Sequence, residues 1–102
     1  MKKNQLVECL DSLTKEEGKR FLAFLESPYF NRNERLPHLL QLLWQNGGTL
    51  DKGWLFEGLF PGESFQDQWL RNELSYLFRL LKQFLMLERW QDQGIHRYPL
   101  LL

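Results

Sequence analysis

Apolar residues recur along this chain at intervals of three or four positions, and no segment alternates apolar and polar residues convincingly. Intervals of three or four bring side chains onto one face of an α-helix, whereas a strand needs a period of two. The pattern therefore predicts an all-α fold, a compact bundle of about five helices with a long, central helix near its C-terminal end. The short first helix holds apolar residues at Leu6, Leu10 and Leu13.

Cap and turn residues separate the predicted helices. Thr14 and Glu17 have the spacing of a capping box, in which each side chain satisfies a free backbone N–H group of the other residue. Asp51 is the expected N-cap of the fourth helix, with Leu50 and Leu55 placed to form a hydrophobic staple across it. Helix ends are predicted at three turn signals: Pro28, Asn46-Gly47-Gly48 and Pro61-Gly62.

The connector between the second and third helices contains two aromatic residues, Tyr29 and Phe30. We expect them to plug the core from the connector. The third helix should begin between Glu34 and Pro37, because proline is tolerated in the first turn. Its expected buried face comprises Leu36, Leu39, Leu40, Leu43 and Trp44.

The last helix, expected from about Asp67 to about Arg89, is the longest. Its main apolar seam follows a spacing of four and three: Leu70, Leu74, Leu77, Leu81 and Phe84. A second side also has apolar groups, at Trp69, Tyr76, Leu80 and Leu87. A helix that is apolar on two sides is usually central. It should either be buried between the other helices or cover a partner.

We expect residues 1–90 to form a single helical domain and residues 91–102 to form a tail. Gln91-Asp92-Gln93-Gly94 interrupts the helix, and the sequence then closes on Leu100, Leu101 and Leu102. Because chain termini are normally polar and frayed, three final leucines favour two interpretations. The segment is either the cut end of a longer protein or a docking tail.

Composition supports a folded domain and argues against some functions. The chain is 43% hydrophobic and 15% aromatic, and each large side chain contributes roughly 1.5–3 kcal/mol when fully buried. Its 13 basic and 13 acidic residues cancel, whereas a nucleic-acid-binding protein usually has a basic excess. No signal peptide and no apolar run approaching the roughly 20 residues of a membrane span occur. A cytoplasmic, soluble protein is expected.

Candidate chemistry is sparse. Cys9 is the one cysteine, and with His38 and His96 it forms no metal-ligand spacing. Glycine-rich phosphate-binding patterns and nucleophile elbows are also absent. We therefore expect no metal, no cofactor and no catalytic activity.

The leading hypothesis is a protein-interaction or scaffolding domain. Its expected interaction surface joins the seam of the last helix to the final leucines: Leu70, Leu74, Leu77, Leu81, Phe84, Leu100, Leu101 and Leu102. A protein partner, the rest of a longer chain or a second copy of this chain would cover it. The competing interpretation is that the first four helices fill the seam completely.

Within residues 49–81, a short helix ends in Leu59-Phe60-Pro61, and a longer helix follows with Ser75, Leu77, Arg79 and Leu81 in an S-x-L-x-R-x-L pattern. This arrangement resembles the helix-turn-helix of winged-helix regulators. The resemblance implies a DNA-binding regulatory module as the alternative function, with base or phosphate contacts from Gln68, Arg71, Asn72, Ser75 and Arg79.

Two features depart from the winged-helix pattern. A strand hairpin should follow Leu85, but this sequence continues helically, and the acidic Glu73 would face phosphates or bases unfavourably. A winged-helix-like arrangement used for packing therefore competes with DNA reading.

A second resemblance covers most of the chain. The string Phe24-Leu25-Glu26-Ser27-Pro28-Tyr29-Phe30-Asn31 is followed by Leu59-Phe60-Pro61-Gly62 and by Asp67-x-x-Leu70-Arg71-Asn72. Together these resemble the N-terminal segment of a bacterial family of longer, mostly helical proteins with no assigned activity. The resemblance implies an all-helical fold and a longer parent protein, and it implies no catalytic residues.

Overall fold

The computed structural model describes residues 5–47 and 50–92. These residues form α-helices and turns without a strand, which confirms the all-α prediction. The helices are α1 (Gln5–Asp11), α2 (Lys15–Glu26), α3 (Arg35–Gln45), α4 (Lys52–Leu59) and α5 (Asp67–Asp92). Within the described ranges, no helix is both long and apolar enough to cross a membrane.

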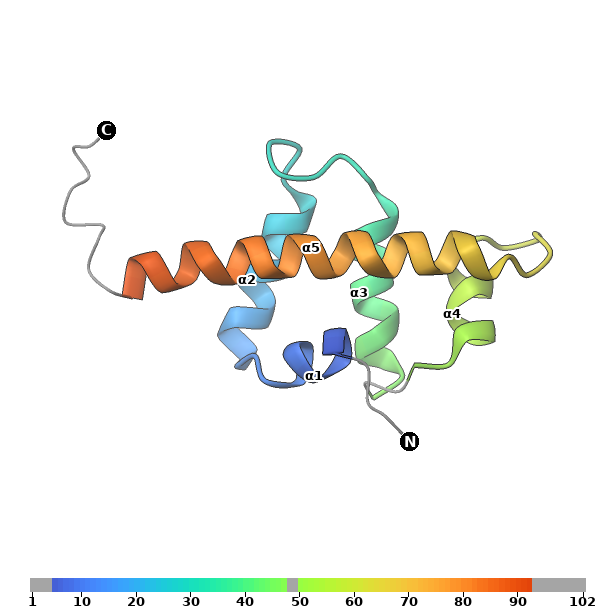
Figure 1. The fold of residues 1–102 in the computed structure, drawn as a ribbon, viewed down its shortest axis with the longest axis horizontal. Coiled ribbons are helices and arrows are strands. Elements are labelled where there is room, and N and C mark those ends of the chain that lie inside the picture. The colour runs from blue at the N-terminus through green and yellow to red at the C-terminus, as the bar shows by residue number, and fades with distance from the viewer. Residues whose placement is uncertain (1–4, 48–49, 93–102) are drawn as a thin grey trace.

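The long helix α5 lies across three shorter helices (Figure 1). Helices α2, α3 and α4 follow one another along α5, and each of them packs against it. Helix α3 also packs against both α2 and α4, so it shares the central position that we expected for α5. The C-terminal turns of α5 extend past α2 in this view.

The predicted caps form as the sequence indicates. Thr14 Oγ1 accepts from the backbone N–H of Glu17, whose carboxylate accepts from the N–H of Thr14. Asp51 accepts from the N–H of Trp54 at the start of α4. Gly47 and Gly62 adopt positive φ angles of 65° and 88° after α3 and α4, a conformation that favours glycine. These signals therefore set the helix boundaries locally.

The start of α3 has a cap that the sequence pattern did not predict. Glu34, the N-cap residue, makes no capping hydrogen bond. Instead the side-chain oxygen of Asn33 accepts from the N–H of Arg35 at 2.9 Å. Because Asn readily hydrogen-bonds the backbone two residues on, Asn33 performs this role from outside the helix.

The seam of α5 belongs to the core of the chain. Its side chains are 0–9% exposed and pack in one cluster with α2, α3 and α4: Leu70, Leu74, Leu77, Leu81 and Phe84. Phe84 contacts Phe21 and Phe24 of α2, with ring centroids 5.2 and 5.6 Å apart. The expectation of an open surface at these five residues is therefore wrong. Three shorter helices each turn an apolar face to α5 and cover the seam, as the competing interpretation predicted.

The second side of α5 is only partly covered. Leu80 is buried, whereas Trp69, Tyr76 and Leu87 are each a little over two-fifths exposed. Helix α5 continues past the expected domain boundary at residue 90 and ends at Asp92. The three leucines of the expected interaction surface at positions 100–102 lie outside the described residues.

The connector before α3 is closed by an asparagine as well as an aromatic ring. Phe30 stacks on Phe24 with centroids 4.4 Å apart, but Tyr29 is 88% exposed and touches only the edge of Phe30. The prediction that both rings plug the core is therefore wrong for Tyr29 and only partly right for Phe30, which stacks on Phe24 but is itself 38% exposed. Buried Asn31 closes the connector by donating to the carbonyl oxygen of Leu25 at 2.8 Å. Tyr29 lies in the tight turn closed by the hydrogen bond from Phe30 N–H to the Ser27 carbonyl, and its side chain is exposed to solvent.

Candidate binding pocket between α1, α2 and α3

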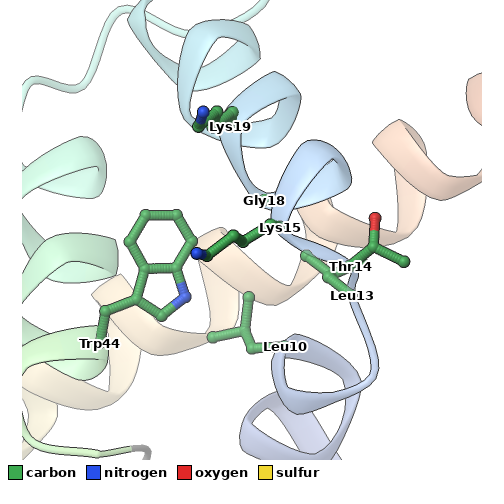
Figure 2. Close-up of a pocket in the computed structure, with 7 residues that line it drawn as sticks. All are labelled: Leu10, Leu13, Thr14, Lys15, Gly18, Lys19 and Trp44. Atoms are coloured by element: carbon green, nitrogen blue, oxygen red, sulfur yellow. The ribbon is translucent and has the colours of Figure 1, made fainter.

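A pocket of about 370 Å³ lies where α1, α2 and α3 meet. Leu10 of α1 and Leu13 of the following turn form its apolar floor, and Trp44 of α3 forms the opposite wall. Figure 2 shows Leu10 directed into the space beside the indole of Trp44. This volume lies near the lower end of the range of about 300–1,000 Å³ that is usual for ligand sites. The pocket suits bulky apolar side chains.

Trp44 was expected on the buried face of α3, and this expectation is wrong: its residue surface is 41% exposed. The four leucines with which it was grouped are all buried. Trp44 lies near the C-terminal end of α3, and its indole reaches α2 at Gly18. The core ends there, so one side of the ring faces the pocket.

Gly18 permits this close approach. It lies in the first half of α2 and is buried, and a Cβ atom placed on it would lie 3.2 Å from Cζ2 of Trp44. Glycine within a helix costs about 0.8–1 kcal/mol relative to alanine. The absence of a side chain at Gly18 lets the indole lie against the α2 backbone, and this contact shapes the pocket.

Two lysines line the edge of the pocket. Lys15 and Lys19 lie one turn apart on α2, both are exposed, and neither has an ion-pair partner among the described residues. Figure 2 shows the Lys15 side chain extending toward Trp44. The remaining lining residue, Thr14, is uncharged. The described lining is therefore apolar inside and positive at its edge.

The principal buried charge lies elsewhere, between α3 and α5. Glu73 is 7% exposed and accepts from Asn33 Nδ2 at 2.9 Å and from the guanidinium of Arg35 at 3.0–3.1 Å. Both carboxylate oxygens thus have partners, as a buried charge requires. This arrangement ties α3 to α5. Because both carboxylate oxygens already have partners within the chain, we assign Glu73 a structural role.

Helix α5 also displays the polar residues of the DNA-binding alternative. All five are exposed: Gln68, Arg71, Asn72, Ser75 and Arg79. Several of them are engaged with neighbours, since Gln68 donates to Asn72 at 2.8 Å and Arg79 lies over the ring of Tyr76. Arg71 pairs with Asp67 at 2.9 Å. DNA binding by this face stays a prediction, which retardation of duplex DNA at low salt would test.

Asp67 opens α5 between two cations. A hydrogen bond from Lys52 at 3.2 Å lowers the pKa of the Asp67 carboxyl below its ordinary value, and Arg71 adds to the effect. At the other end of the helix, Arg20 of α2 donates to both oxygens of Glu88, which raises the pKa of Arg20. These ion pairs attach α5 to α4 and α2.

Metal chemistry has no visible support in the described part of the chain. Across these residues, His, Cys, Asp and Glu side chains do not gather in groups of three or more that could hold an ion. Cys9 is partly buried and packed against the core, and His38 is exposed. His96 lies outside the described ranges.

Comparisons with known proteins add no relative. No protein-family model matches the sequence, and neither the curated proteins nor the solved structures contain a significant match.

The pocket was missed because its residues were assigned to other roles in the sequence. Two signals on α2 point to it. Gly18 lies inside an otherwise good helix, and Lys15 and Lys19 place like charges four positions apart, which is slightly unfavourable for the helix. Neither choice benefits the isolated helix, and all three residues border the same pocket.

Proposed function

We propose that this chain is a protein-interaction or scaffolding domain without catalytic activity, and that it binds a segment of a protein partner in the pocket between α1, α2 and α3. The observation that supports the proposal is the placement of Trp44: the residue is 41% exposed, and its indole lies against Gly18 beside the apolar floor of the pocket. Exposed aromatic groups in a pocket are typical centres of protein–protein interfaces.

The pocket replaces the seam of α5 as the proposed interaction surface. Residues such as Leu77 and Leu81 are fully covered by the chain's own helices, so a partner could reach them only if the bundle opened. Opening would expose much of the apolar core and would cost several kcal/mol. The Trp44 pocket is accessible in the folded chain, so binding there requires no such cost.

Selection of peptides on the folded chain tests this proposal. A phage-displayed library of random 12-residue peptides is selected on the immobilised chain, and enriched peptides are synthesised for titration. We expect enriched peptides to bind at least about tenfold more weakly to Trp44→Ala, because central aromatic anchors commonly contribute 1.4 kcal/mol or more. Trp54→Ala is the matched control, since Trp54 is also 41% exposed but does not line the pocket.

A measurement on the unaltered chain guards against a folding defect in the variant. The NMR signal of the Trp44 indole N–H, assigned by its loss in Trp44→Ala, should shift on addition of an enriched peptide while the Trp54 signal stays unchanged. Failure to enrich any peptide would contradict the proposal. Enriched peptides that bind both tryptophan variants equally and leave the Trp44 signal unmoved would also contradict it.

A further inference from the structure

We infer that the segment bound by the Trp44 pocket is acidic: a bulky apolar side chain enters the pocket, and carboxylates beside it pair with Lys15 and Lys19. This inference rests on the proposed function and adds the chemistry of the partner. It follows from the charges at the edge of the pocket, from how the chain uses its other cations, and from the positions of nearby carboxylates.

Lys15 and Lys19 differ from the cations that hold the bundle together. Salt bridges occupy Arg20, Arg35, Lys52 and Arg71, which pair with Glu88, Glu73 or Asp67. Those ion pairs link one helix to another or stabilise the start of α5. The two lysines make no such contact in the described chain, so their charges are available to a ligand.

The positions of the two lysines suit a single bound segment. Residues four apart on a helix lie about 5–6 Å from each other at their Cβ atoms, so both ammonium groups can reach carboxylates on one peptide. Their aliphatic stems extend along the apolar lining while the charges stay in water. Partial exclusion of water by a bound peptide strengthens such charge pairs relative to fully exposed ones.

Among the residues that the structure describes, no carboxylate lines the pocket to compete for these lysines. The neighbouring acid Glu17 is held by the N–H group of Thr14 in the capping box. Glu16 is exposed on α2 but does not border the pocket. The two lysines therefore impose a positive edge on an apolar site, which selects an acidic ligand over a basic one.

Three synthetic 12-residue peptides test this inference. Each has a central leucine-phenylalanine pair, flanked by four glutamates, four glutamines or four lysines. Affinity is measured at 20 mM and 300 mM NaCl by the shift of the Trp44 indole N–H signal. We expect the glutamate peptide to bind about tenfold more tightly than the glutamine peptide at low salt, since each of the two charge pairs strengthens binding by a few-fold. The high salt concentration should remove most of the difference.

Charge reversal supplies the specificity control. The double variant Lys15→Glu/Lys19→Glu should prefer the lysine peptide, whereas Lys82→Glu, an exposed lysine of α5 outside the pocket, should keep the original preference. Equal affinity for the glutamate and glutamine peptides would overturn the inference and leave the proposed function standing. If neither these peptides nor library-selected ones shift Trp44, both fail.

A vesicle assay separates the acidic peptide from a second anionic partner. Vesicles of phosphatidylcholine containing phosphatidylserine are added to the chain in place of peptide. We expect no shift of the Trp44 signal with vesicles. A shift with vesicles and none with the glutamate peptide would overturn the inference in favour of a membrane surface.

Discussion

Arg35 of α3 and Glu73 of α5 are 38 positions apart in the sequence, and their charged groups lie 3.0 Å apart in the structure. Glu73 is 7% exposed, whereas the Arg35 side chain is about half exposed. The carboxylate also accepts a hydrogen bond from Asn33, next to the start of α3. One acidic side chain thus holds the beginning of α3 against the N-terminal third of α5.

We expect Glu73→Gln to lower the free energy of unfolding by about 1–2 kcal/mol. Glutamine can still accept from Asn33, but it removes the charge that pairs with Arg35 and can turn an N–H group toward the guanidinium. Urea unfolding followed by circular dichroism measures the change. A double-mutant cycle with Arg35→Gln should give a coupling of about 1 kcal/mol, and additive effects of the two substitutions would contradict the interaction.

Leu77 and Leu87 of α5 should respond very differently to truncation. Leu77 is 0% exposed and lies in the core, whereas Leu87 is 43% exposed. Leu77→Ala should lower stability by about 2–5 kcal/mol through the lost apolar burial and the resulting cavity, and Leu87→Ala by less than about 1 kcal/mol. Thermal or urea unfolding at two protein concentrations checks both values. Destabilisation by Leu77→Ala that depends on protein concentration would instead indicate that a second copy covers this seam.

Gly18 and Gly58 offer a matched pair of helix glycines with opposite expected outcomes. A Cβ on Gly18 would lie 3.2 Å from the ring of Trp44, whereas a Cβ on Gly58 would lie 2.7 Å from Cδ1 of buried Leu42. Because the half-exposed indole can shift outward, Gly18→Ala should gain about 0.5 kcal/mol from helix propensity. Gly58→Ala should lose about 1–2 kcal/mol by overpacking the α3–α4 contact.

Urea midpoints of the two variants check this prediction. In Gly18→Ala, the Trp44 indole signal should also shift without loss of stability, because the ring moves toward the pocket. Destabilisation by Gly18→Ala equal to that of Gly58→Ala would mean that Trp44 is packed too rigidly to move.

The Asp67 ion pairs make the free energy of unfolding depend on pH. Since Lys52 lowers the pKa of the folded carboxyl below that of the unfolded chain, the stabilisation is fully present above the unfolded pKa of about 3.9 and is lost as the pH falls through the folded pKa. Asp67→Asn should therefore be less stable than the parent chain near pH 6, and this difference in stability should narrow as the pH falls below about 4.

Urea unfolding across that pH range measures the gap, with Asp11→Asn, an exposed residue at the C-terminal end of α1, as the control. Repeating the pH 6 measurement at 1 M NaCl should shrink the gap, because exposed ion pairs are screened by salt. A gap that persists unchanged at pH 2 would contradict the electrostatic origin.

Local sequence signals predicted most of the helix boundaries. The capping box at Thr14, the N-cap at Asp51 and the glycines after α3 and α4 act on backbone groups within a few residues, so their effect is readable without the fold. The periodicity of α5 likewise identified the five side chains of its seam. Each of these features depends on neighbours along the chain.

Periodicity could not decide what covers the apolar faces. The spacing of Leu70 to Phe84 is the same whether the cover is α2, α3 and α4 or a second copy, and only the packed structure shows that the chain covers it. The prediction that Trp44 is buried was wrong for the same reason. The position of Trp44 in the helical pattern matches that of the buried leucines, but Trp44 lies at the edge of the core.

The sequence alone thus determined which segments are helical and where they stop, because those choices depend on interactions within one or two turns. Tertiary structure decided how the helices cross, and thereby which apolar side chains are buried. It also paired Glu73 with Arg35 and brought Gly18, Trp44 and two lysines to one pocket. Contacts between residues distant along the chain arise only when several helices pack together, and no local pattern specifies them.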